Sequence, residues 1–105
     1  MTAYEILKAA KAIGDERGWH ATSVVDRNGM GVCIMGALNV VATGDPCKRA
    51  RPTSEHMKAL RALANCAGVP DFTCISFWWD VASPAERELA LDRAIEATGP
   101  KQTSP

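Results

Sequence analysis

The chain has 105 residues, enough for one domain around one hydrophobic core. Twelve Lys and Arg residues balance twelve Asp and Glu residues, so no net charge draws the protein to nucleic acid or to an anionic membrane. The longest uncharged run, Asn28 to Gly44, is shorter than the roughly 20 apolar residues of a bilayer span, and the N-terminus does not resemble a secretory signal. We therefore expect a cytoplasmic protein that binds no membrane, and nucleic-acid binding through Lys48, Arg49 and Arg51 ranks last among the candidate functions.

The first predicted elements are a helix and a β-hairpin. A capping-box pattern in the first five residues, followed by apolar residues at helical spacing, predicts a helix from about Ala3 to Arg17 that ends at Gly18. Residues 21–25 are typical of a strand, and Asn28-Gly29 is a strong signal for a two-residue hairpin turn. We expect a two-stranded hairpin that reaches Val32 and packs on helices, because two strands alone are marginally stable in water.

A second helix is predicted from Cys33 to Thr43, with Gly44 as its C-cap. This stretch is apolar on every side except at Asn39, which predicts a central, buried helix. Asn39 then needs hydrogen-bond partners, since a buried amide without them destabilises the fold.

Two further helices follow. Thr53 or Ser54 is the expected N-cap of a third helix that ends near Gly68, and residues 72–79 read as an irregular segment rich in aromatic side chains. Ser83-Pro84-Ala85-Glu86 combines an N-cap serine, a proline in the first turn and a glutamate three positions after the cap, which predicts a last helix.

These elements predict one compact domain over residues 1–99 and a disordered tail over residues 100–105. The expected fold class is α+β and mainly helical, with about four helices and one two-stranded β-hairpin.

Cys33 has two interpretations. A thiol in the first turn of a helix meets the positive end of the helix dipole, which lowers its pKa and favours a nucleophile. His20 or His56 then offers a general base, and Asp80 offers a group to orient it. Alternatively, Cys33 packs as a small apolar residue between glycines that admit close helix contacts. We favour packing and keep a thiol-dependent enzyme or redox-sensitive domain as the alternative.

The four cysteines do not form a metal-binding pattern. They lie 14, 19 and 8 positions apart, whereas structural zinc sites use closely paired ligands. In a cytoplasmic protein we expect reduced thiols, with no metal and no cofactor. The cysteines are Cys33, Cys47, Cys66 and Cys74.

Three basic residues, Lys48, Arg49 and Arg51, stand between two prolines just before the third helix. Positive charge near a helix N-terminus is suited to a phosphate or an acidic partner, which makes this loop a weak anion-binding candidate. A solvated connection is the favoured interpretation.

The segment around Trp78, Trp79 and Asp80 is the main candidate for partner binding. Adjacent tryptophans cannot both point the same way, so one enters the core and the other stays near the surface. We expect Trp79 to be the exposed one, because an exposed tryptophan beside an acidic residue is typical of a protein-binding hot spot.

Three motifs together resemble a known family: Gly18-Trp19, then Cys33 followed by Gly36-Ala37, then Trp78-Trp79-Asp80. Over roughly the first 99 residues the chain is similar to a domain of unknown function that is common in actinobacteria and their phages. Trp79 stands where that family typically has asparagine, so a polar site there would be reduced to Asp80. The resemblance implies an actinobacterial or phage source and no known activity.

We therefore expect a small, non-enzymatic accessory protein that binds a protein partner through an aromatic surface, with a phage as one candidate source. The partner is a host protein or a second copy of the chain, so a homodimer remains open. For a phage protein the expected location is the host cytoplasm.

Overall fold

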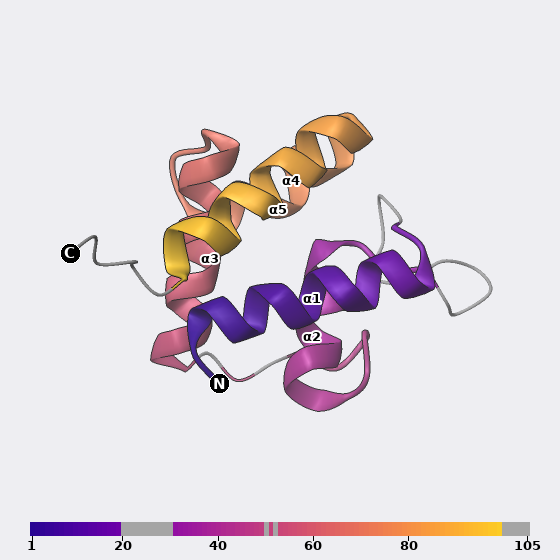
Figure 1. Ribbon diagram of the computed structural model, residues 1–105. Coiled ribbons are helices and arrows are strands. Elements are labelled where there is room, and N and C mark those ends of the chain that lie inside the picture. The colour runs from indigo at the N-terminus through magenta and orange to yellow at the C-terminus, as the bar shows by residue number, and fades with distance from the viewer. Residues whose placement is uncertain (20–30, 50, 52, 100–105) are drawn as a thin grey trace.

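The fold is that of a computed structural model, which describes residues 1–19, 31–49, 51 and 53–99. The described part of the chain is built from helices (Figure 1). In order they are α1 (Ala3–Arg17), α2 (Ile34–Thr43), α3 (Ser54–Ala67), the short 3-10 helix η1 (Phe72–Cys74), α4 (Ile75–Val81) and α5 (Pro84–Thr98). None of these helices is long and apolar enough to cross a bilayer.

The predicted hairpin and the α+β class are wrong. The described residues contain no strand, and the only β-type pairing among them is an isolated parallel bridge between Trp19 and Val32. In that bridge the Val32 N–H donates to the Gly18 carbonyl at 2.9 Å. The strand expected over residues 21–25 lies outside the described residues. The Asn28-Gly29 turn and the predicted tail over residues 100–105 lie outside the described residues.

The helix ends follow the capping signals of the sequence. Thr2 and Ser83 each form the reciprocal hydrogen bonds of a capping box at the start of α1 and α5. The Thr53 hydroxyl accepts the backbone N–H of His56 at 3.1 Å and begins α3. The expected boundaries of α1 are confirmed residue for residue.

The segment predicted to be irregular forms η1 and α4 instead. The Asp71 side chain accepts the backbone N–H of Thr73 at 2.8 Å and starts the 3-10 turn. Ile75 and Trp79 then stand four positions apart, on one side of a helix, and both are buried. Burial of these two side chains stabilises a short helix that its aromatic composition alone does not predict.

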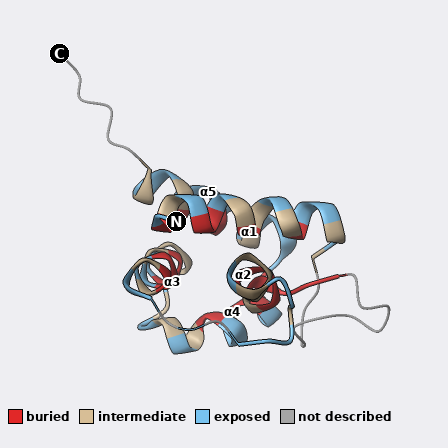
Figure 2. Cartoon of the chain, turned by 90° about the horizontal axis from the view of Figure 1, so that it is seen from below, coloured by how far each residue is buried: buried red, intermediate tan, exposed pale blue. Residues whose placement is uncertain are grey.

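The helices enclose a single core. α1 packs against α2, α3 and α5, and α3 also packs against α4 and α5. In Figure 2, α1 and α5 lie along one side of the molecule, and α4 lies on the opposite side beyond α2 and α3. Each helix turns its buried residues inward. The largest fully buried side chains are Leu7, Val32, Ile34, Leu38, Leu63, Ile75, Trp79 and Leu91.

α2 is buried along one side and not all round, in contrast to the prediction. Ala37 and Leu38 are fully buried, whereas Val41 is half-buried and Ala42 is exposed. Asn39 was expected to be a buried amide in need of partners. It is half-buried instead, and its Nδ2 donates to the Pro46 carbonyl at 2.9 Å. This bond holds the loop that follows the helix.

Candidate functional site

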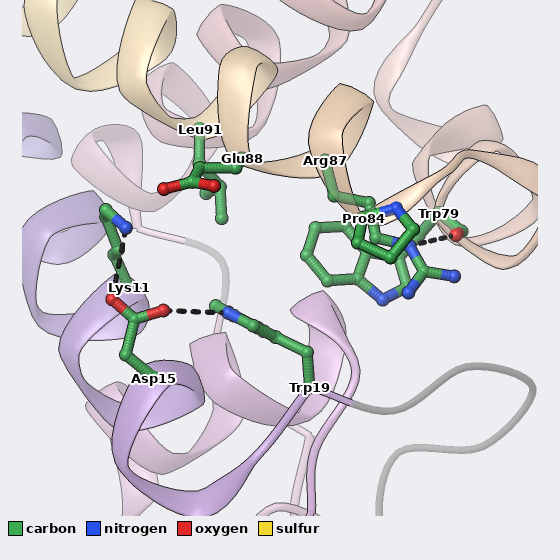
Figure 3. A pocket seen from close by; sticks show the side chains of 8 residues that line it. All are labelled: Lys11, Asp15, Trp19, Trp79, Pro84, Arg87, Glu88 and Leu91. Atoms are coloured by element: carbon green, nitrogen blue, oxygen red, sulfur yellow. Dashed lines mark hydrogen bonds and ion pairs between the residues drawn. The ribbon is translucent and has the colours of Figure 1, made fainter.

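A cleft of about 320 Å³ lies between α1 and α5 at the end of the molecule where α4 and α5 meet (Figure 3). Figure 3 shows α1 side chains on one wall and α5 side chains on the other. The lining residues are Lys11, Asp15, Trp19, Trp79, Pro84, Arg87, Glu88 and Leu91.

Trp79 forms the inner wall of this cleft without exposing any surface of its own. Its ring contacts the Trp19 ring at a centroid distance of 4.8 Å and the Trp78 ring at 6.2 Å. The Arg87 guanidinium lies 5.0 Å above the ring centroid, within range of a cation–π contact. Arg87 Nε also donates to the Trp79 carbonyl at 2.7 Å, so this arginine ties α5 to the C-terminal end of α4.

Asp15 and Lys11 hold the opposite wall. The Trp19 indole N–H donates to Asp15 Oδ1 at 3.0 Å, and Lys11 Nζ lies 3.0 Å from Asp15 Oδ2. Burial pushes the pKa of Asp15 upward, but the hydrogen bonds from Lys11 and Trp19 outweigh it and leave the pKa lowered. The hydrogen bond to Asp15 raises the pKa of Lys11. Both groups are therefore charged at neutral pH.

These polar groups position tryptophan rings and join helices. Lys11 also approaches Asp92 of α5, with Nζ 3.9 Å from Oδ1, which links the two walls. The lining contains no cysteine, serine or histidine, and its charged side chains are those of Lys11, Asp15, Arg87 and Glu88.

Cys33 serves as a helix cap. It is buried, and its Sγ accepts the backbone N–H of Gly36 at 3.4 Å as the N-cap of α2. His56 is buried in the first turn of α3, and no hydrogen bond connects it to Cys33 in the described part of the chain. Asp80 is exposed on α4, and His20 lies outside the described residues. Cys33, His56 and Asp80 thus stand on three different helices, α2, α3 and α4, while the pairing of Cys33 with His20 lies outside the described residues.

No metal centre is formed by the described residues. Within residues 1–19, 31–49, 51 and 53–99, no three His, Cys, Asp or Glu side chains lie close enough together to hold an ion.

The exposure expected of Trp79 is wrong, because Trp79 is the tryptophan that enters the core and Trp78 is half-buried. Phe77 is the exposed aromatic residue, with 74% of its surface accessible, and Val81 is 66% exposed. The helical periodicity of the sequence could have identified the exposed aromatic residue. Ile75 and Trp79 face inward, so position 77 between them faces outward.

Of the three basic residues in the loop, Arg51 lines a second pocket, near the start of α3. Lys48 and Arg49 are exposed and line none of the described pockets.

Comparison with known proteins identifies a family without assigning an activity. No curated protein and no solved structure matches the chain. The model of a family of unknown function, DUF6197, matches residues 1–97. This match agrees with the resemblance to an uncharacterised domain, and the chain therefore belongs to the DUF6197 family.

Proposed function

We propose that the protein is a non-enzymatic interaction protein that binds another protein through the outer face of α4. The observation that carries this proposal is the exposure of Phe77 and Val81, at 74% and 66%, on one short helix. They are four positions apart and so lie one above the other on the same face. Asp80 is exposed beside them, and Trp78 is half-buried next to Phe77 in the chain.

The contrast within α4 supports a binding role for this face. Trp79 is locked inside the molecule by Trp19 and Arg87, which gives α4 a rigid inner side. A rigid base reduces the conformational entropy that an exposed aromatic side chain loses on binding. Phe77 is therefore the anchor of the contact, with Val81 beside it and Asp80 at its rim, and the partner offers an apolar groove.

The cellular location and the biological source in this proposal are those expected from the sequence. We keep, as parts of this proposal, a cytoplasmic location and an actinobacterial or phage source. The partner is a host protein or a second copy of the chain. With equal numbers of acidic and basic residues, two copies meet without net electrostatic repulsion.

The test is site-specific photo-crosslinking in cells that naturally make the protein. The photoreactive residue p-benzoylphenylalanine replaces Phe77 in one variant and Glu96 in the control. Glu96 is exposed near the far end of α5, about 18 Å along the helix from its first residue. We expect one discrete adduct from position 77 that is absent from position 96.

The mass of the adduct identifies the kind of partner. An adduct of twice the 11.2 kDa chain mass is a homodimer, and one discrete larger mass is a different protein. Adding Val81→Asp to the position 77 variant should abolish either adduct, because a charge then enters the apolar contact. No adduct, or the same products from positions 77 and 96, would overturn the proposal.

A further inference from the structure

A second pocket, about 290 Å³ in volume, lies where the first turns of α1 and α3 meet α2. It is distinct from the cleft between α1 and α5, with which it shares no lining residue. Its apolar walls include Ile6 from α1 and Leu38 and Val41 from α2. Its polar lining includes His56 from α3 and Arg51 from the preceding loop.

A buried histidine such as His56 is an unusual residue in the wall of a mainly apolar pocket. Only 8% of its surface is exposed, and the structure gives its ring no hydrogen-bond partner in the described part of the chain. Among the same residues, no fully buried side-chain nitrogen or oxygen atom lacks a partner. The ring nitrogens of His56 therefore keep a small accessible surface, and His56 is one of the residues that line the pocket. A polar group in this position can form a hydrogen bond with a ligand atom.

Burial lowers the pKa of His56, so the imidazole is neutral at physiological pH. A neutral imidazole carries one N–H donor and one acceptor nitrogen. It can therefore donate one hydrogen bond to a ligand without placing a second charge inside the pocket.

Arg51 supplies the charge. It is exposed, and no carboxylate of the described residues lies within ion-pair distance of its guanidinium. The nearest acidic residue in sequence, Glu55, is occupied elsewhere, because its Oε2 accepts the Ala3 backbone N–H at 2.8 Å and its Oε1 lies 3.0 Å from Lys58 Nζ. These bonds lower the pKa of Glu55, that from Ala3 most, and they fix the start of α1 against α3.

We propose that this pocket binds a small carboxylate ion with a compact hydrocarbon body. The carboxylate pairs with the Arg51 guanidinium and accepts a hydrogen bond from the His56 ring. The hydrocarbon body contacts Ile6, Leu38 and Val41. The hydrocarbon body of such a ligand matches the apolar walls, whereas a phosphate has no apolar part to place against them. The volume is near the lower limit for small-molecule sites, roughly 300 Å³, which suits a short-chain acid.

The test is an NMR titration of the whole protein with sodium hexanoate. The reporters are the ring protons of His56 and the methyl groups of Leu38 and Val41. Hexanol offers the same body without the carboxylate, and acetate offers the carboxylate without the body. We expect saturable shifts of all three reporters with hexanoate, and binding weaker by about tenfold or more for hexanol and for acetate.

Two arginine variants separate recognition from general positive charge. Arg51→Gln should weaken hexanoate binding by about tenfold or more, because a charged hydrogen bond is lost. Arg49→Gln is the matched control, since Arg49 is exposed in the same loop but does not line the pocket. It should change the affinity by less than about twofold. Because Arg51 is exposed, its substitution leaves the core intact, which the unliganded spectrum verifies.

The Ala42→Leu substitution tests the site independently, because it should fill the pocket and exclude hexanoate. Ala42 is an exposed residue that lines the pocket, so a larger side chain there fills the space without entering the core. It should prevent the hexanoate shifts.

Four results would each overturn the proposal: no shift of the reporters with hexanoate, equal binding of hexanol, equal losses from the two arginine variants, or displacement of hexanoate by inorganic phosphate at the same concentration. None of them bears on the outer face of α4, so the two proposals fail independently.

Discussion

The indole ring of Trp19 lies against the Cα of Gly14, so closely that a Cβ atom at position 14 would stand 2.0 Å from Cζ2 of the ring. Other atoms of the ring would lie 2.2 Å away. The ring cannot retreat freely, because it also contacts the Trp79 ring and its N–H is bonded to Asp15. Glycine at position 14 is thus required by close packing and not by backbone conformation.

Gly14→Ala should therefore destabilise the protein, although alanine is the better helix former. We expect a loss of about 1–3 kcal/mol in the free energy of unfolding, as is typical of overpacking. Urea denaturation followed by circular dichroism measures it. Ala12→Gly, at an exposed position of α1, is the control for helix propensity and should cost about 1 kcal/mol. A Gly14→Ala variant more stable than the wild type would contradict the contact.

The two aromatic residues of α4 should respond to truncation in opposite ways. Trp79→Ala removes a fully buried ring and should cost about 3–5 kcal/mol of unfolding free energy. Phe77→Ala removes an exposed ring and should change stability by less than about 0.5 kcal/mol. Thermal and urea unfolding of the two variants test this contrast. Equal losses would mean that Phe77 is buried in solution.

Burial of His56 predicts a pH dependence of stability. Because its pKa is lowered in the folded state, the unfolded chain binds a proton more readily below the ordinary value of 6.5. The free energy of unfolding should be constant above that pH and fall on acidification towards pH 5, by no more than about 1.4 kcal/mol per pH unit for one proton. Denaturation at a series of pH values measures the slope.

His56→Leu is the control for this slope. It keeps an apolar contact and removes the titrating group, so the fall between pH 6.5 and 5 should diminish relative to the wild type. Working above pH 5 avoids the carboxyl groups whose pKa values are lowered, such as those of Glu5 and Glu86, which are bonded at their helix starts. An unchanged slope in His56→Leu would assign the proton to another group.

The cysteines should differ in their rates of alkylation by iodoacetamide. Cys47 is exposed and should react first, whereas Cys33 is buried and should react only on unfolding. Burial raises the pKa of the half-buried Cys66, so it should react more slowly than Cys47 near pH 8. Mass spectrometry of the peptides at timed intervals gives the order. Rapid labelling of Cys33 in the folded protein would revive the thiol-dependent alternative.

The fold was predictable where local chemistry decides it. The start of α1, α3 and α5 depends on one hydroxyl and a few neighbouring residues, and these patterns are visible in the sequence. The α4 helix was missed because its stability comes from burial of Ile75 and Trp79 in the core, which local propensity does not contain.

The candidate site likewise depends partly on local sequence patterns and partly on tertiary packing. The sequence predicts that one tryptophan of the pair enters the core, but which ring is buried depends on contacts with Trp19, far away in sequence, and with Arg87 of the next helix. Neither His56 nor Arg51 signals a shared pocket in the sequence, since the apolar walls come from α1 and α2. Such a pocket is formed by tertiary packing alone.

The tryptophan cluster also makes the protein's own fluorescence a local signal. Trp19 and Trp78 both contact Trp79 at one end of α1, while Tyr4, the single tyrosine, lies at the other end, about 20 Å away along the helix axis. Excitation at 295 nm therefore observes only the junction of α1, α4 and α5. If its emission changes before the helical dichroism is lost, that junction opens while the remaining helices are still folded.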